Sequence, residues 1–107
     1  MKPPTPAPAY AFTFHIMAEA AQAKGYALAL HGSMQRDLDV VAVPWTEEAA
    51  PAEELVDAIA ARIGAWLRPT DPTYRNPEPK PHGRRAWQLI LQAGLYIDLS
   101  VMPRSTP

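Results

Sequence analysis

Residues 28–45, LALHGSMQRDLDVVAVPW, contain the pattern on which the fold depends. Short apolar runs on both sides of Gly32-Ser33 predict two strands that are joined by a tight turn. Because side chains alternate between the two faces of a strand, Asp37 and Asp39 are expected to share one face of the second strand. Neighbouring carboxylates repel each other, so the pattern favours a divalent cation with oxygen ligands between them.

A third carboxylate has a similar setting near the C-terminus, in residues 96–100, YIDLS. An acid in the middle of an apolar strand lowers stability unless it is paired or ligated. We therefore expect the fold to bring Asp98 beside Asp37 and Asp39, where the three acids would form a metal site. The alternatives are a solvated strand start and local ion pairs, with Arg36 for the first two acids and with Arg84 or Arg85 for Asp98.

Charge is unevenly distributed along the chain, although the formal net charge is only −1. Residues 37–57 contain seven acids and no Lys or Arg, whereas residues 68–85 contain five bases and two acids. A basic segment that folds over an acidic site would suit a metal together with a phosphate ligand. The alternative is a solvated loop that happens to be basic.

The composition restricts the class of protein. A chain of 107 residues, 48% of them hydrophobic, predicts one globular domain rather than a disordered chain. We expect no secretory signal at the N-terminus and no association with a membrane, because no apolar run approaches the ~20 residues that span a bilayer. The chain contains no cysteine, which excludes disulfides and thiolate metal sites and fits a cytoplasmic location.

The periodicity of apolar residues predicts an α+β fold for residues 10–103, between a disordered proline-rich arm at 1–9 and a tail at 104–107. The expected elements are helices at 11–24 and 51–67, strands at 26–31 and 37–43, a proline-rich loop at 68–84, and a hairpin of 86–92 and 95–102 with Ala93-Gly94 as its turn. We expect about four strands in a mixed or antiparallel sheet, with both helices on one face and the acids on the other.

Gly32-Ser33 followed by Asp37-Leu38-Asp39, with Asp98 on a later strand, resembles the nucleotidyltransferase superfamily that includes DNA polymerase beta. The resemblance covers residues 26–45 and 95–102. It implies a minimal core of that superfamily, in which the three acids are catalytic residues that bind Mg²⁺ or Mn²⁺ and transfer a nucleotidyl group to a hydroxyl. The residues that would bind the nucleoside triphosphate are Gly32, Ser33, Arg36, Lys80, Arg84 and Arg85.

One segment departs from the pattern of that superfamily. Its members have a longer segment with a helix start between the serine and the first acid, whereas here only residues 34–36 intervene, so the usual phosphate-binding helix start is shortened or missing. The strings RDLDVVAVPW and YIDLSVMP are also similar to short proteins of bacteriophage and prophage origin, which would place the chain in a host cytoplasm. The alternative function is a catalytically inactive interaction protein. Its protein partner, or a second copy of the chain, would bind to the face of the sheet that carries the acids, which we call the open face. Whether nucleic acid is a partner is left open.

Overall fold

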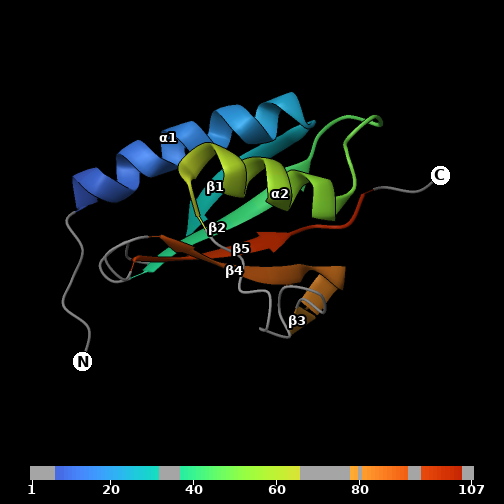
Figure 1. Ribbon diagram of the computed structural model, residues 1–107. Helices are drawn as coiled ribbons and strands as arrows, with labels where there is room; N and C mark the ends of the chain where they lie inside the picture. The colour runs from blue at the N-terminus through green and yellow to red at the C-terminus, as the bar shows by residue number, and fades with distance from the viewer. Residues whose placement is uncertain (1–6, 32–36, 66–77, 80, 92–94, 105–107) are drawn as a thin grey trace.

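The computed structural model of the chain describes residues 7–31, 37–65, 78–79, 81–91 and 95–104. Within these ranges the side chains of residues 7–10, 31, 37, 78 and 95 are not described. The helices are α1 (Ala7–Ala23) and α2 (Ala52–Ile63), and the strands are β1 (Tyr26–His31), β2 (Asp37–Pro44), β3 (Glu78–Pro79), β4 (Arg85–Leu91) and β5 (Leu95–Val101). Figure 1 shows both helices on one face of the sheet.

The sheet is mixed, with the strand order β1-β2-β5-β4-β3. Strand β2 is parallel to β5, and the other neighbouring strands are antiparallel. A parallel pair requires a long crossover, which α2 and the chain after it provide. The α+β class and the mixed sheet of four main strands are therefore confirmed, and the two-residue strand β3 adds a short fifth strand within the predicted loop.

The core lies between the sheet and the helices. Apolar residues at alternating positions of β2, β4 and β5 are at most 2% exposed and face α1 and α2: Leu38, Val40, Ala42, Trp87, Leu89, Ile97, Leu99 and Val101. In α2 the predicted apolar stripe is confirmed by the buried residues Leu55, Val56 and Ile59. No helix among the described residues is long and apolar enough to cross a membrane.

The apolar spacing of the first helix predicts a buried stripe of Phe12, Ile16, Ala20 and Ala23, with Met17 beside it. Helix α1 buries only part of this stripe. Met17, Ala20 and Ala21 are buried, whereas Phe12 is 68% exposed and Ala23 is also exposed. The reason is that α1 has small apolar residues on most sides, so its pattern alone does not fix which stripe packs. Helix α1 also begins at Ala7, so the end of the predicted arm is helical, while residues 1–6 lie outside the described part of the chain.

Helix α2 ends earlier than its apolar pattern predicts. The last helical residue is Ile63, because Gly64 adopts a left-handed conformation with φ of 69°. The two residues that would extend the stripe, Trp66 and Leu67, lie outside the described residues. The helix begins after Pro51, close to the predicted start.

The hairpin of β4 and β5 is confirmed, but its register differs from the predicted one. Leu91 pairs with Leu95, so three residues, 92–94, separate the strands instead of the predicted two-residue turn. These three residues are not described by the structure. Because of the extra residue, each residue of β5 pairs with the residue of β4 that lies one position before the predicted partner.

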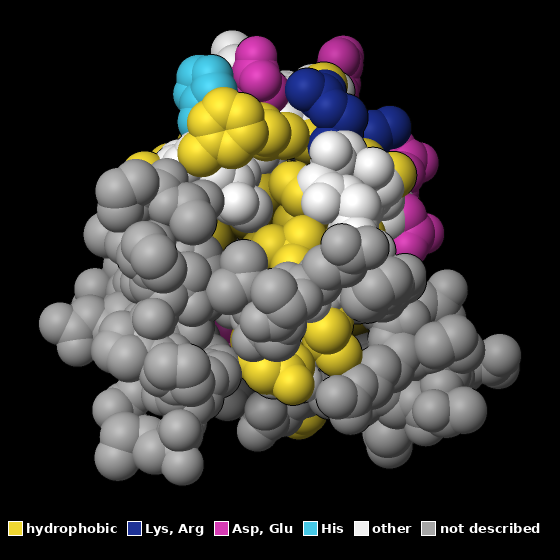
Figure 2. All heavy atoms as spheres, turned by 60° about the vertical axis from the view of Figure 1, so that its left-hand side comes forward, with side chains coloured by type: hydrophobic (Ala, Val, Ile, Leu, Met, Phe, Trp, Pro, Cys, Tyr) yellow, Lys and Arg dark blue, Asp and Glu magenta, His cyan; other side chains and the backbone are white. Residues whose placement is uncertain are grey.

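The outer surface of the helix layer carries charges of both signs. Glu19 lies 4.0 Å from His15 along α1 and 3.7 Å from Arg62 of α2. Figure 2 shows acidic, basic and histidine side chains close together at its top, where the helix layer lies. Exposed ion pairs of this kind contribute little to stability.

The buried Tyr26 connects the start of β1 to the loop before α2. It is 1% exposed, and its hydroxyl donates a hydrogen bond of 2.7 Å to the Ala50 carbonyl. Burial raises the pKa of the Tyr26 hydroxyl, although the charges of Arg104 and Arg85 oppose that shift. Because the raised pKa favours the neutral phenol in the folded state, its contribution to stability is complete below the unfolded value of about 10 and is lost at higher pH.

We predict that Tyr26→Phe lowers the free energy of unfolding by about 1 kcal/mol at neutral pH, because the Ala50 carbonyl loses its donor. Urea unfolding of both proteins at neutral pH and above about pH 10 measures this difference. The difference should shrink at the higher pH, where the natural protein loses the contribution of the neutral phenol. A difference that grows with pH would contradict the assignment.

Candidate metal centre

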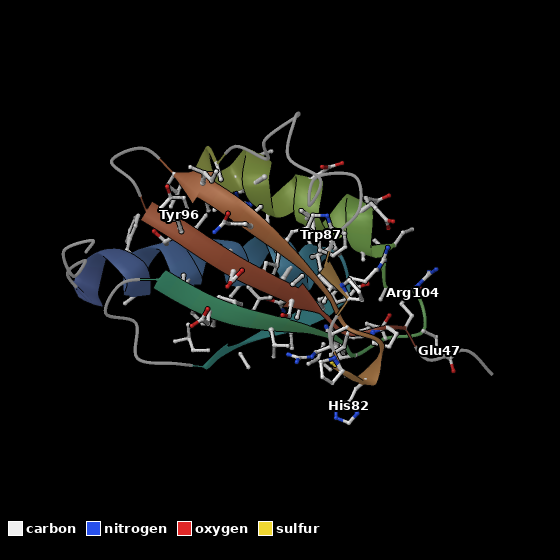
Figure 3. The ribbon with its side chains drawn as sticks, turned by 90° about the horizontal axis from the view of Figure 1, so that it is seen from below. Glu47, His82, Trp87, Tyr96 and Arg104 are labelled. Atoms are coloured by element: carbon white, nitrogen blue, oxygen red, sulfur yellow. The ribbon has the colours of Figure 1, made fainter. Side chains whose placement is uncertain are left out.

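The register of the sheet brings two of the predicted acids side by side. Asp39 of β2 pairs with Asp98 of β5, and Gln88 of β4 pairs with Asp98 on its other side. Residues that pair directly in a ladder point to the same face, and neighbouring strands are about 4.8 Å apart. Asp39, Asp98 and Gln88 therefore form a polar row across β2, β5 and β4, on the face opposite the helices. Figure 3 shows the sheet from this side, with the helices behind it.

The third predicted acid, Asp37, lies two residues before Asp39 at the start of β2. Asp37 pairs with Tyr96 through its backbone, and its parity matches that of Asp39, but its side chain is not described. Among the side chains that the structure describes, no group of three His, Cys, Asp or Glu residues could hold a metal ion. The structure thus establishes the adjacency of Asp39 and Asp98, and the trio with Asp37 stays a prediction.

The surroundings of the polar row differ along the strands. Asp39 is half-buried, and Asp98 and Gln88 are exposed. The next row of the same face contains Val41 and Ser100, which is 7% exposed, and beyond them Val43 is 42% exposed. The open face therefore has a polar part at the start of β2 and an apolar part at its end.

The donor set of the polar row fits a hard divalent cation. Carboxylates that lie directly opposite each other in a ladder destabilise the sheet, and a cation between them removes this repulsion. Carboxylate and amide oxygens are the ligands that Mg²⁺ and Mn²⁺ prefer. In such a site Asp39 and Asp98 would supply the charge, and Gln88, which pairs with Asp98 from the neighbouring strand, would offer a neutral oxygen.

Gln88 is the residue of this face that sequence reasoning missed. A two-residue turn at Ala93-Gly94 would pair Gln88 with Leu99, which points toward the helices. The observed register pairs it with Asp98 instead. The alternation of residues 86–92 could have shown that Gln88 faces away from Trp87 and Leu89, but only the length of the connection places it beside an acid.

Two of the predicted nucleotide-binding residues, Arg84 and Arg85, lie in the described part of the chain. The others lie outside it: Gly32, Ser33, Arg36 and Lys80. The Nε atom of Arg84 donates to the Pro81 carbonyl at 3.2 Å, a local contact.

Arg85 lies on the other side of the sheet from the acids in this structure, and its predicted role at the triphosphate stays a prediction. It pairs with Val101 in the register and therefore lies on the helix side of the sheet. Its guanidinium donates to Glu53 of α2 at 3.0 and 3.4 Å and lies 5.2 Å from the centroid of the Trp87 ring. By the alternation along β4, Arg85 lies on the face of the sheet opposite to Asp98.

The Glu53–Arg85 pair leads to a prediction about pH. The hydrogen bond from Arg85 lowers the pKa of the Glu53 carboxyl. Its contribution to stability is therefore present above the unfolded value of about 4.3 and is lost as pH falls through the folded value. We expect Glu53→Gln to cost less than about 1 kcal/mol at pH 7, because the pair is exposed, and nothing near pH 3, as measured by urea unfolding. An equal cost at both pH values would contradict an ionic contribution.

Comparisons with protein-family models, with curated proteins and with solved structures find no significant match for this chain. The class of the protein therefore has to be argued from its own strands and side chains.

Proposed function

We propose that this chain is a minimal nucleotidyltransferase-like protein that binds a divalent cation and a nucleoside triphosphate at its open face. In this proposal Asp39 and Asp98 hold the cation, Asp37 is the third carboxylate, and the reaction is transfer of a nucleotidyl group to a hydroxyl. The observation that carries the proposal is the direct pairing of Asp39 with Asp98 on neighbouring parallel strands.

The connectivity around this pair also supports the proposal. Strand β1 is antiparallel to β2, and α2 lies between β2 and the parallel strand β5 in the chain. The resemblance implies a further acid on a strand next to the acid pair, and β5 supplies Asp98 at the position of Asp39. The acids also face away from the core, where a substrate has access.

The residues present suggest separate roles in this chemistry. Asp39 and Asp98 provide negative charge for the cation, and Gln88 offers an amide that binds either the cation or a substrate hydroxyl. The bound Mg²⁺ would supply Lewis acidity, which activates the attacking hydroxyl and neutralises the departing pyrophosphate.

A catalytically inactive interaction protein on the same fold is the second candidate. Only three residues, 34–36, separate Ser33 from Asp37, so the segment that binds phosphate in the superfamily is shortened. The apolar part of the open face, where Val43 is 42% exposed, would then contact a protein partner or a second copy of the chain.

Thermal unfolding with Mn²⁺, with ATP and with both together tests the proposed function. A ligand at one hundred times its dissociation constant stabilises the folded state by about 2.7 kcal/mol. We expect the combination to raise the melting temperature of the natural chain and of Asp57→Asn, which makes the same chemical change at an exposed position of α2. Asp39→Asn and Asp98→Asn should remove the shift.

Absence of any shift in the natural chain, or a shift that persists in both open-face variants, would overturn the proposed site. Release of pyrophosphate from ATP in the presence of a hydroxyl acceptor separates the two candidate functions. Binding without pyrophosphate release, at saturating Mn²⁺ and ATP and with varied acceptors, would favour the interaction protein.

A further inference from the structure

A cavity lies on the helix side of the sheet, and neither Asp39 nor Asp98 lines it. Its volume is about 270 Å³, and it is formed where β1 begins, β5 ends and α2 begins, with Tyr26, Val101 and Pro103 among its lining residues. Figure 3 shows Arg104 near the end of β5 that is opposite to Tyr96, whereas Asp98 of the polar row lies in the middle of β5 and on the other face of the sheet. Its charged lining residues are Glu53, Arg85 and Arg104.

Arg104 is held by a backbone carbonyl. Its Nη1 atom donates to the Ala49 carbonyl at 3.1 Å, and no ion pair joins it to any acid among the described residues. A guanidinium has five N–H donors in a fixed fork, so one carbonyl leaves most of its hydrogen-bonding capacity for another group.

Arg85 is fixed on two sides at the same cavity. Its guanidinium lies over the buried Trp87 ring and bonds to both carboxylate oxygens of Glu53. The charges of Arg85 and Arg104 both oppose the rise that burial causes in the pKa of the Tyr26 hydroxyl. At Glu53 the hydrogen bond from Arg85 is the main cause of a lowered carboxyl pKa, and the charges of both arginines act in the same direction. Both arginines line this cavity, and Glu53 is the one carboxylate among its lining residues.

We propose that this cavity binds a small oxyanion of phosphate chemistry, coordinated by Arg104 and Arg85, with Glu53 as an internal competitor. A guanidinium group can donate two parallel N–H hydrogen bonds to two oxygens of a phosphate group. Such charge-assisted hydrogen bonds are stronger than those between neutral groups. The apolar floor that Val101 and Pro103 provide would exclude water from one side of the anion. The volume suits a phosphate group with a small substituent rather than a whole nucleotide. This inference is independent of the function proposed for the open face.

The proposal predicts that substitutions of Arg104 and Glu53 change the affinity for phosphate in opposite directions. Loss of Arg104 removes a direct ligand, so Arg104→Gln should weaken the binding of inorganic phosphate by about tenfold or more. Loss of the Glu53 charge removes a competing anion and releases donors of Arg85, so Glu53→Gln should strengthen the same binding by roughly threefold. Arg62→Gln, at an exposed arginine of α2 outside the cavity, should leave the affinity unchanged.

Titration of the full chain with inorganic phosphate, followed through the arginine Nε–Hε resonances in ¹H–¹⁵N NMR spectra, tests the proposal. Ionic strength is kept constant with NaCl, because screening alone alters exposed charges. We expect saturable shifts of the Arg85 and Arg104 resonances in the natural protein and the stated order of affinities in the variants.

Non-saturating shifts, or shifts that spread evenly over all arginines, would overturn the site. Equal affinity in Arg104→Gln and Arg62→Gln would do the same, and so would weaker binding in Glu53→Gln. The dispersion of each variant's spectrum shows whether it is folded, and Arg104→Lys, which keeps the charge but lacks the fork, provides a second test at the same position with an intermediate affinity expected.

Discussion

Replacing Gly25 by alanine is expected to lower the free energy of unfolding by about 2–5 kcal/mol. Gly25 has a φ of 88°, and a Cβ atom added there would lie 2.8 Å from the Cα of Ala49. The left-handed conformation accounts for about 1–2 kcal/mol, and the backbone contact adds the rest. The Gly25 carbonyl also accepts the Trp45 N–H at 3.0 Å, so this position joins the end of α1 to the segment after β2.

Gly64→Ala is the matched control for this prediction. Gly64 has a φ of 69° and also follows a helix, but an added Cβ would meet nothing within 4 Å. It should therefore cost only the conformational part, about 1–2 kcal/mol. Urea unfolding of both variants measures the difference, and equal losses would contradict the close packing of Gly25 against the loop before α2.

The second large effect concerns cation binding at the open face. We expect Asp39→Asn and Asp98→Asn each to weaken Mn²⁺ binding by about 100-fold or more, because each removes one of two adjacent carboxylates and even groups behind the ligands account for 10–100-fold. Isothermal titration calorimetry measures the affinities, with Asp57→Asn of α2 as the control of equal charge change.

The effect of Asp39→Asn on the free energy of unfolding should change sign when the metal is added. In EDTA the variant should be more stable than the natural protein by up to about 1 kcal/mol, because like charges that face each other across neighbouring strands are destabilising. With saturating Mn²⁺ the natural protein should be the more stable one. Lower stability of the variant under both conditions would mean that Asp39 has a structural role instead.

The sequence predicts the strands and α2 well because local physics decides them. The alternation around Leu38 and Ile97 separates an apolar side from an acidic side, and the structure has both as expected. Gly25 follows Lys24 at the end of the first predicted helix and therefore predicts a left-handed helix end, which the structure has with a φ of 88°. Helix α1 could not be predicted to the same degree, because its small apolar residues leave the buried stripe undetermined until it packs against α2 and β1.

Pairing between distant strands was harder to predict. The placement of Asp98 beside Asp39 required β2 and β5 to be parallel neighbours, which the topology provides but no local pattern dictates. The connection between β4 and β5 is one residue longer than predicted, and this length places Gln88 opposite Asp98. Arg85 lies three positions before Gln88, so it points to the other side of the sheet, where it bonds to Glu53. The uneven distribution of charge therefore predicted a basic segment at residues 68–85, but not the face of the sheet on which its side chains lie.

Crystals of the protein grown with Mn²⁺, measured for anomalous scattering at the manganese edge, test the central claim most directly. The account predicts one peak on the open face of the sheet, within about 2.0–2.2 Å of an oxygen atom of both Asp39 and Asp98. No peak at saturating Mn²⁺, or a peak that contacts neither aspartate, would contradict it.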